Sequence, residues 1–189
     1  MNRTSTASRI LEAADRLFYH RGIRAVGVDT VAAEAGVSKR TLYNHFPSKD
    51  HLIAAYLTAR FRPIPPSDAP AREQVLGAFD RLERIISDGS FRGCPYVNAV
   101  TEIGEAGHPA VAIARRFKEE RRQWYRALLE RLKAKDADGL ATQLQLLFEG
   151  GLAAALVHGD PAVARSARSA AEILLDAALP RAKRRRRKA

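Results

Sequence analysis

The sequence is poor in residues that would cross-link its fold. Its 189 residues include a single cysteine, Cys94, which excludes a disulfide within the chain and favours a reducing compartment. The five histidines have no metal-type spacing with acidic residues or with Cys94. We therefore expect no bound metal and no cofactor. The fold then rests on a hydrophobic core, for which a hydrophobic content of 46% is sufficient.

Several other signatures are also missing. No apolar run approaches the roughly 20 residues that span a bilayer, and the N-terminus has no apolar signal core. No segment alternates polar and apolar residues as a strand does, and no internal repeat is present. The sequence has no glycine-rich phosphate loop, and Cys94 has no obvious histidine partner. These absences predict a cytoplasmic, all-α protein that has no membrane partner and is not an enzyme.

Positive charge is concentrated at the two ends of the chain. Of the net charge of +11, residues 1–62 contribute +5, residues 63–180 contribute −1 and residues 181–189 contribute +7. The excess in the N-terminal part fits a polyanionic partner, but a solvated basic surface would have the same charge. The tail at 181–189 has nothing to bury, and we expect it to be disordered.

Apolar residues recur at helical spacing along almost the whole chain, with glycine and proline between the segments. Four prolines between residues 63 and 70 cannot lie in one helix and mark a linker. The helices expected around and beyond this linker cover about 48–61, 71–88, 96–104, 109–134 and 140–158, and a last helix ends near 179.

A helix-turn-helix pattern lies in residues 28–46. Two short helices flank Gly36-Val37-Ser38, where Gly36 tolerates the positive φ of a tight turn and Ser38 can cap the second helix. Small alanines on the first of these helices permit a close approach to the helix that precedes the motif. The residues expected to bury against that preceding helix are Val31, Ala32, Ala35, Leu42 and Phe46.

The outer face of the second helix is polar and rich in hydrogen-bond donors. A helix fits the major groove of B-DNA, where arginine and asparagine best match guanine and adenine edges. Thr41 suits a thymine methyl group, whereas Tyr43 and Lys49 are placed for phosphates. The predicted DNA-binding residues on and beside this helix are Ser38, Lys39, Arg40, Thr41, Tyr43, Asn44, His45 and Lys49.

Residues 35–50, Ala-Gly-Val-Ser-Lys-Arg-Thr-Leu-Tyr-Asn-His-Phe-Pro-Ser-Lys-Asp, resemble the signature of the TetR family of transcriptional regulators, and the resemblance covers about residues 5–57. The family often has Ser or Thr where this chain has Gly27 and Val28, so Thr30 is the substitute phosphate contact there. The resemblance implies an N-terminal three-helix helix-turn-helix DNA-binding domain, assigned to residues 1–50. A C-terminal helical ligand-binding and dimerisation domain follows at 51–180, and the basic tail occupies 181–189.

The resemblance also implies a small-molecule effector in the C-terminal domain. A pocket needs apolar and aromatic walls with a few polar handles, and the alternative for each candidate is a place in the core. Cys94 precedes Pro95 near a helix start, so it is either a sensor of oxidants or electrophiles, or a small buried hydrophobe. The candidates are Phe79, Phe91, Cys94, Tyr96, Asn98, Glu102, Phe117, Trp124, Tyr125 and Phe148.

The last two helices carry apolar seams that suit a homodimer, since two such hairpins can pack as a four-helix bundle. A two-fold dimer would read a palindrome with half-sites roughly 34 Å apart. The alternative is that these seams complete each chain's own core. The predicted interface residues are Leu144, Leu147, Gly151, Leu152, Ala155, Leu174 and Ala178.

Together these features predict a ligand-responsive repressor that binds a palindromic operator in double-stranded DNA and is released by its effector. The alternative is a non-specific nucleic-acid-binding protein driven by the basic tail, whose seven positive charges would neutralise several phosphates. Deletion of 181–189 distinguishes the two, because only the alternative requires the tail for detectable binding.

Overall fold

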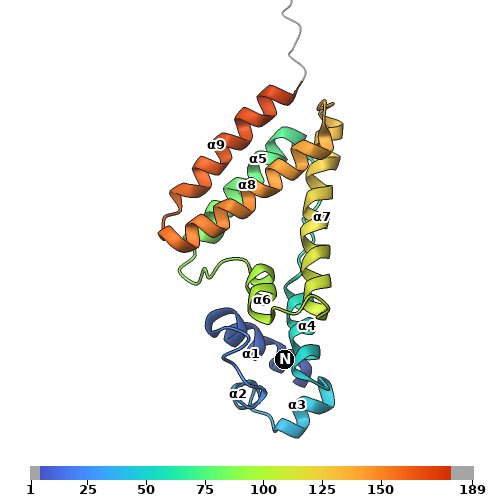
Figure 1. Ribbon diagram of the computed structural model, residues 1–189, viewed down its shortest axis with the longest axis vertical. Helices are drawn as coiled ribbons and strands as arrows, with labels where there is room; N and C mark the ends of the chain where they lie inside the picture. The colour runs from blue at the N-terminus through green and yellow to red at the C-terminus, as the bar shows by residue number, and fades with distance from the viewer. Residues whose placement is uncertain (1–4, 180–189) are drawn as a thin grey trace, which may run out of the picture. The chain divides into compact units, whose positions relative to one another are not determined.

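The computed structural model describes residues 5–179, and every regular element in that range is an α-helix (Figure 1). This confirms the all-α prediction. The nine helices of this range belong to two compact units, one made of residues up to 64 together with 92–119, and the other made of 65–91 with the residues from 120 onward. The predicted basic tail at 181–189 lies outside the described residues.

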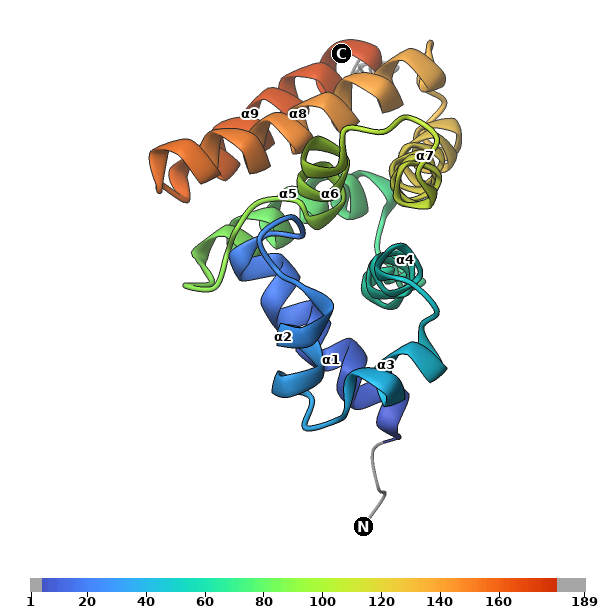
Figure 2. The same ribbon diagram turned by 60° about the horizontal axis from the view of Figure 1, so that its bottom comes forward.

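Unit 1 is built around the first helix. One face of this helix buries Ile10, Ala14 and Phe18. The helices of the unit are α1 (Thr6–Arg21), α2 (Val28–Glu34), α3 (Lys39–His45), α4 (Lys49–Arg60), α6 (Pro95–Ile103) and the first half of α7 (Pro109–Arg131). The helices α2, α3 and α4 lie around α1 (Figure 2).

The ends of α1 follow from its sequence. The Ser5 hydroxyl accepts a hydrogen bond from the Ser8 backbone N–H at 3.1 Å and so caps the first turn. Gly22 ends the helix with a φ of +89°, which favours glycine. A Cβ at this position would lie 2.9 Å from the Glu102 carboxylate, so the close approach of α6 also requires glycine.

Residues 92–119 pack on α4 and on the loop that follows α1. The Tyr96 hydroxyl donates to the Leu57 carbonyl at 3.3 Å, and the Tyr96 ring stacks on Phe117 with centroids 4.0 Å apart. Glu102 accepts a hydrogen bond from the Arg24 backbone N–H at 3.0 Å. These contacts explain why the compact units differ from the contiguous division at residue 50 that the sequence suggested.

Unit 2 contains α5 (Ala71–Ser87), α8 (Ala137–His158), α9 (Ala162–Ala178) and the second half of α7. The helices α5, α8 and α9 lie side by side (Figures 1 and 2). Phe79 of α5 meets Phe148 of α8 with ring centroids 6.1 Å apart, and both rings are buried. Arg72 of α5 also pairs with Glu172 of α9 at 3.2 Å.

Helix α8 is apolar on more than one face. Within the described residues, it is the one helix that is long and apolar enough to cross a membrane, with a mean hydropathy of 1.4 in an 18-residue window. The core helix of a soluble protein passes the same test, and 44% of that window is buried inside the protein. Gly159, in the left-handed conformation at φ +67°, ends α8, in agreement with the helix expected over about 140–158.

Candidate nucleic-acid interface

The turn between α2 and α3 has the predicted chemistry. Gly36 has a φ of +62°, and the N–H of Val37 donates to the Ala32 carbonyl at 3.0 Å. The Ser38 hydroxyl accepts from the Thr41 N–H at 3.0 Å and caps α3. The turn therefore sets the direction of α3 by backbone geometry and one side-chain cap.

Arg9 of α1 secures this turn from the side. Its guanidinium donates to the carbonyls of Ala35 at 2.5 Å and Gly36 at 3.1 Å. A Cβ on Gly36 would lie 3.1 Å from the same guanidinium. The sequence analysis did not find Arg9, because its partners are backbone atoms 26 and 27 residues away.

The inner face of the motif is buried largely as predicted. Val31, Ala32, Ala35 and Leu42 are all less than 9% exposed. Phe46 is only half-buried, because α3 ends at His45 and Phe46 is in extended backbone. The buried inner face of the motif is thus made by Val31 and Ala32 of α2, by Ala35 at the end of α2 and by Leu42 of α3.

The outer face of α3 presents Arg40, Tyr43, Asn44 and His45 to solvent. Within residues 5–179, neither Arg40 nor Asn44 has a hydrogen-bond or ion-pair partner. Their donors are available to base edges without breaking an internal contact. Tyr43 is 38% exposed, a position open to a phosphate.

The two lysines among the predicted DNA-binding residues each make a hydrogen bond within the protein. Lys39 donates to Asp29 of α2 at 3.0 Å, and this hydrogen bond, together with the Asp29 charge, raises the pKa of Lys39. Lys49 donates to the Ile23 carbonyl at 2.6 Å, and partial burial lowers its pKa. Lys49 therefore joins the start of α4 to the loop after α1, and a phosphate contact from its remaining ammonium donors stays a prediction.

The start of α2 lacks a side-chain cap, as expected where Gly27 and Val28 replace a hydroxyl residue. Gly27 is the N-cap residue and makes no side-chain hydrogen bond. Thr30 is exposed one residue beyond the acidic Asp29 of the first turn. Its hydroxyl stays the predicted phosphate contact at this end of the motif.

Of the predicted effector-pocket residues, five lie in unit 1, and the structure gives each of them an internal partner. The stacked Tyr96 and Phe117 belong to the packing of α6 on α7, and Glu102 binds the Arg24 N–H. The Asn98 side chain donates to the Arg92 carbonyl at 2.7 Å across the loop before α6. These contacts complete unit 1, so they favour the structural alternative for these four residues.

Cys94, the fifth residue, is the N-cap of α6 and is 8% exposed. The Lys118 ammonium donates to its sulfur at 3.3 Å. The burial fits the small-hydrophobe alternative, and sensing by Cys94 stays a prediction.

The remaining pocket candidates lie in unit 2. Phe79 and Phe148 are buried against each other, and Trp124 packs beside Tyr125 with ring centroids 5.0 Å apart. Phe91 is half-buried just before α6. The sequence thus identified an aromatic cluster on α5, α7 and α8, but it mixed this cluster with residues that complete unit 1.

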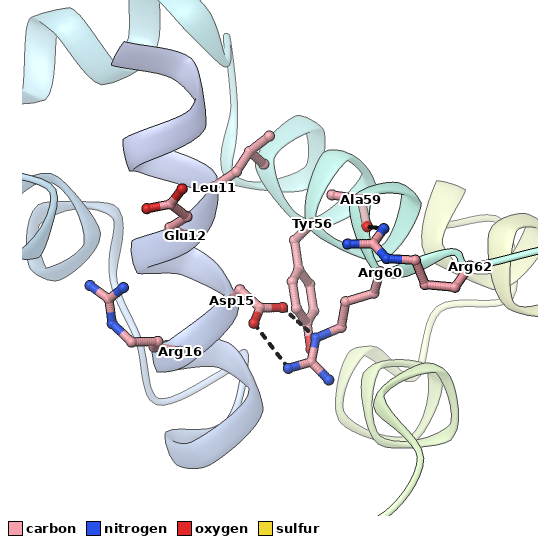
Figure 3. A pocket seen from close by; sticks show the side chains of 8 residues that line it. All are labelled: Leu11, Glu12, Asp15, Arg16, Tyr56, Ala59, Arg60 and Arg62. Carbon is pink, nitrogen blue, oxygen red and sulfur yellow. Dashed lines mark hydrogen bonds and ion pairs between the residues drawn. The ribbon is translucent and has the colours of Figure 1, made fainter. Parts of the chain in front are cut away.

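A polar hollow of about 460 Å³ lies between α1 and α4, and no predicted pocket residue lines it (Figure 3). The Arg60 guanidinium binds both carboxylate oxygens of Asp15 and lies 4.1 Å from the centroid of the Tyr19 ring. The Tyr19 hydroxyl in turn donates to the Gly93 carbonyl at 3.0 Å. This network joins α1, α4 and the loop before α6.

Three of the predicted dimer residues are buried inside unit 2. Leu144, Leu152 and Ala155 are at most 8% exposed within a single chain, which favours the alternative that they complete the chain's own core. A Cβ on Gly151 would lie 2.8 Å from Leu82 of α5, so this glycine serves the contact between α8 and α5.

An apolar groove on the other face of α8 and α9 was missed. It has a volume of about 690 Å³, and no charged residue lines it. Three of the predicted interface residues do line it, namely Leu147, Gly151 and Leu174. Leu146, which lines the groove, is 65% exposed, and Ile173 of α9 is 67% exposed. Because α8 is apolar on both faces, helical periodicity alone did not distinguish the inner face from the outer one. The remaining predicted residue, Ala178, is half-buried at the end of α9.

Sequence comparison points to one protein family. The sequence model described as bacterial regulatory proteins of the tetR family matches residues 10–56. The chain is 30% identical over 128 residues to the helix-turn-helix-type transcriptional repressor KstR2 of Mycobacterium tuberculosis. This match covers 64% of this chain and 63% of that protein. Another helix-turn-helix-type regulator of M. tuberculosis is 45% identical over 51 residues, only 25% of its length. The chain thus spans less than two thirds of these curated relatives.

Solved structures resemble the whole fold. The crystal structure of a TetR-type transcriptional regulator from Streptomyces avermitilis is 37% identical, with a TM-score of 0.84, and the match covers 92% of this chain and 98% of that one. A TetR-family regulator from Streptomyces coelicolor is 30% identical with a TM-score of 0.81, covering 92% and 95%.

Proposed function

Because this chain belongs to the TetR family of bacterial regulatory proteins, we propose that it binds DNA sequence-specifically and regulates transcription as a repressor. A regulator of transcription acts where the chromosome is, which in a bacterium is the cytoplasm. The prediction that the chain is not an enzyme agrees with a family of regulatory proteins.

The observation that carries this proposal is the outer face of α3. Its donors Arg40 and Asn44 are exposed and have no partner within residues 5–179, and Ser38 and Gly36 fix the direction of the helix. A rigid helix with unpaired donors suits base readout in the major groove. Tyr43 and Thr30 are the proposed phosphate contacts beside it.

A second copy of the chain is the proposed occupant of the groove on α8 and α9. The groove is apolar, and the exposed Leu146 and Ile173 would leave water when a second hairpin packs on them. A two-fold dimer presents two α3 helices to successive major grooves, so the operator is a palindrome with half-sites roughly 34 Å apart.

The route from an effector to α3 runs through α4, which follows the recognition helix directly. Residues 92–119 hold α4 at two points, the Tyr96 bond to the Leu57 carbonyl and an approach of 3.4 Å between His108 and Asp50. An effector that displaces this segment would move α4, and with it α3. A coupling free energy of about 1–3 kcal/mol would weaken operator binding by roughly 5-fold to 150-fold.

Selection of bound sequences from a random duplex pool tests the proposed function. We expect a palindromic consensus, and we expect Arg40→Ala and Asn44→Ala each to relax the preference at one base pair by about 1–3 kcal/mol. Arg21→Ala, an exposed arginine at the end of α1, is the matched control and should leave the consensus unchanged. If no sequence is enriched, and if binding disappears when 181–189 is deleted, the result would instead support the non-specific alternative.

A further inference from the structure

Unit 2 encloses a tyrosine hydroxyl that has no hydrogen-bond partner. Tyr125 of α7 is 0% exposed, and within residues 5–179 its hydroxyl oxygen is buried without a donor or acceptor opposite it. Burial of this group raises its pKa, so the phenol stays protonated and able to donate. A buried polar group without a partner costs free energy, and folded proteins therefore satisfy nearly all such groups.

A second unsatisfied atom lies in the same region. The side-chain oxygen of Gln145 on α8 is buried and has no donor, although its amide nitrogen donates to Glu149 at 3.0 Å. The negative charge of Glu149 also acts on the Tyr125 phenol, so the two unsatisfied groups share one neighbour. One site thus offers a hydrogen-bond donor and an acceptor that the protein itself leaves unused.

Positive charge surrounds these two groups. The Arg121 guanidinium lies 4.0 Å from the centroid of the Phe148 ring, and the Arg81 guanidinium lies 5.8 Å from that of Trp124. Both guanidinium charges act on Tyr125. Arg81 stands at the exposed edge of the cluster, and it has no hydrogen bond or ion pair in the part of the chain that the structure describes. Its partial desolvation lowers its pKa, a cost that a bound anion would relieve.

From this geometry we infer that the cluster on α5, α7 and α8 binds a small organic monoanion, a carboxylate that also carries a hydroxyl or N–H donor. The carboxylate accepts from the Tyr125 hydroxyl and from Arg81, and the ligand's own donor satisfies the Gln145 oxygen. The guanidinium charges of Arg81 and Arg121, both of which act on the Tyr125 phenol, favour a negatively charged group on the ligand. The inference rests on the proposed function in that this ligand would be the effector.

Trp124 makes the site directly measurable, because it is the only tryptophan in the chain and lies inside the cluster. The full chain, without DNA, is titrated with lactate and mandelate, with their hydroxyl-free counterparts propionate and phenylacetate, and with the uncharged lactamide and mandelamide. We expect saturable changes in Trp124 fluorescence with the carboxylates. Affinity should fall about tenfold when the hydroxyl is absent and at least as much when the charge is absent.

Two variants assign the binding to named groups. Tyr125→Phe removes only the unsatisfied hydroxyl, so carboxylate affinity should fall about tenfold while the thermal midpoint of the ligand-free protein stays equal or rises. Arg81→Gln should weaken carboxylate binding at least about tenfold. Arg131→Gln changes the same charge on an exposed position at the end of α7 and should leave the affinity unchanged.

Three outcomes would overturn the inference. The first is the absence of a saturable change with every carboxylate of the panel, and the second is equal binding of carboxylates and amides. The third is a Tyr125→Phe protein that is less stable yet binds carboxylates normally, which would mean that a buried water satisfies the hydroxyl. These outcomes are separate from a failure of the proposed function, since selection of a palindrome from random DNA is measured without any carboxylate.

Discussion

The exposed faces of α3 and α8 differ in kind. Helix α3 has a buried leucine on one side and donors such as Arg40 and Asn44 on the other, so water satisfies its outer face when no DNA is bound. Helix α8 is apolar on both sides, and Leu146 and Val157 remain 65% and 79% exposed. Burying one such side chain contributes roughly 1.5–3 kcal/mol. The comparison teaches that the two proposed interfaces of one chain need opposite chemistry, a polar face for a polyanion and an apolar face for a second copy.

The largest effect is expected when the apolar face of α8 is made polar. Leu146→Glu leaves the single chain folded, because the side chain is already exposed, but it places a charge in the proposed dimer contact. We expect a monomer by light scattering, and operator affinity at least about 100-fold weaker by fluorescence anisotropy, because the two α3 helices are no longer linked.

Ala153→Glu is the control for this experiment. It introduces the same charge at an exposed position of α8 that does not line the groove. The control protein should stay dimeric. If Leu146→Glu is also dimeric, the two chains associate through another surface.

The contact between α8 and α5 should respond mainly in stability. In Gly151→Ala the new methyl group would lie 2.8 Å from a terminal methyl of Leu82 on α5, so the Leu82 side chain or the helices must shift. The free energy of unfolding in urea should fall by about 1–3 kcal/mol. Gly77→Ala, where nothing lies within 4 Å of the added Cβ, should leave stability equal or raise it by up to about 1 kcal/mol.

The cap of α3 contributes less. Ser38→Ala removes the acceptor of the Thr41 N–H and should cost about 1 kcal/mol, which lowers the thermal midpoint by about 2–4 °C. Ser169→Ala, an exposed serine within α9, should leave the midpoint unchanged. Equal midpoints for the two variants would mean that the turn and Arg9 alone hold α3.

The smallest effect concerns the ion pair beside α3. Asp29→Asn frees Lys39, whose pKa should return toward its ordinary value, since Asp29 is what raises it. The salt dependence of DNA binding should steepen by about 0.9 in the slope of log affinity against log salt, as expected for one added phosphate contact. Asp68→Asn, in the linker, is the control for the change of charge. An unchanged slope would show that Lys39 reaches no phosphate.

The sequence alone was sufficient to predict a structural feature wherever that feature depends on neighbouring residues in the chain. Gly36 and Ser38 sit in a turn whose backbone geometry and capping depend on their own residue types, and both have the predicted conformation and bond. The helix stop at Gly159 has the same explanation. The buried face of α2 followed from helical spacing together with the small size of Ala32 and Ala35.

Partners distant in sequence were not predictable in this way. Lys49 was expected at a phosphate, but its ammonium donates a hydrogen bond to the carbonyl of Ile23, 26 residues earlier. Periodicity identified α8 as apolar but assigned Leu144 and Leu152 to a partner chain, although α5 and α9 bury them. Nothing local to residues 92–119 shows that they pack in unit 1, since this depends on hydrogen bonds with distant residues. Tyr19 and Arg24 donate to this segment, and the Leu57 carbonyl accepts from it.

The composite nature of unit 1 limits how recognition can be transferred between regulators. A chimera that exchanges only the first 62 residues would carry every proposed DNA contact. It would also place a foreign α4 and a foreign loop after α1 against the native Tyr96 and Glu102, whose bonds to Leu57 and Arg24 hold these two segments. The unit that can be exchanged intact is therefore discontinuous, and a successful graft has to bring residues 92–119 along with the helix-turn-helix.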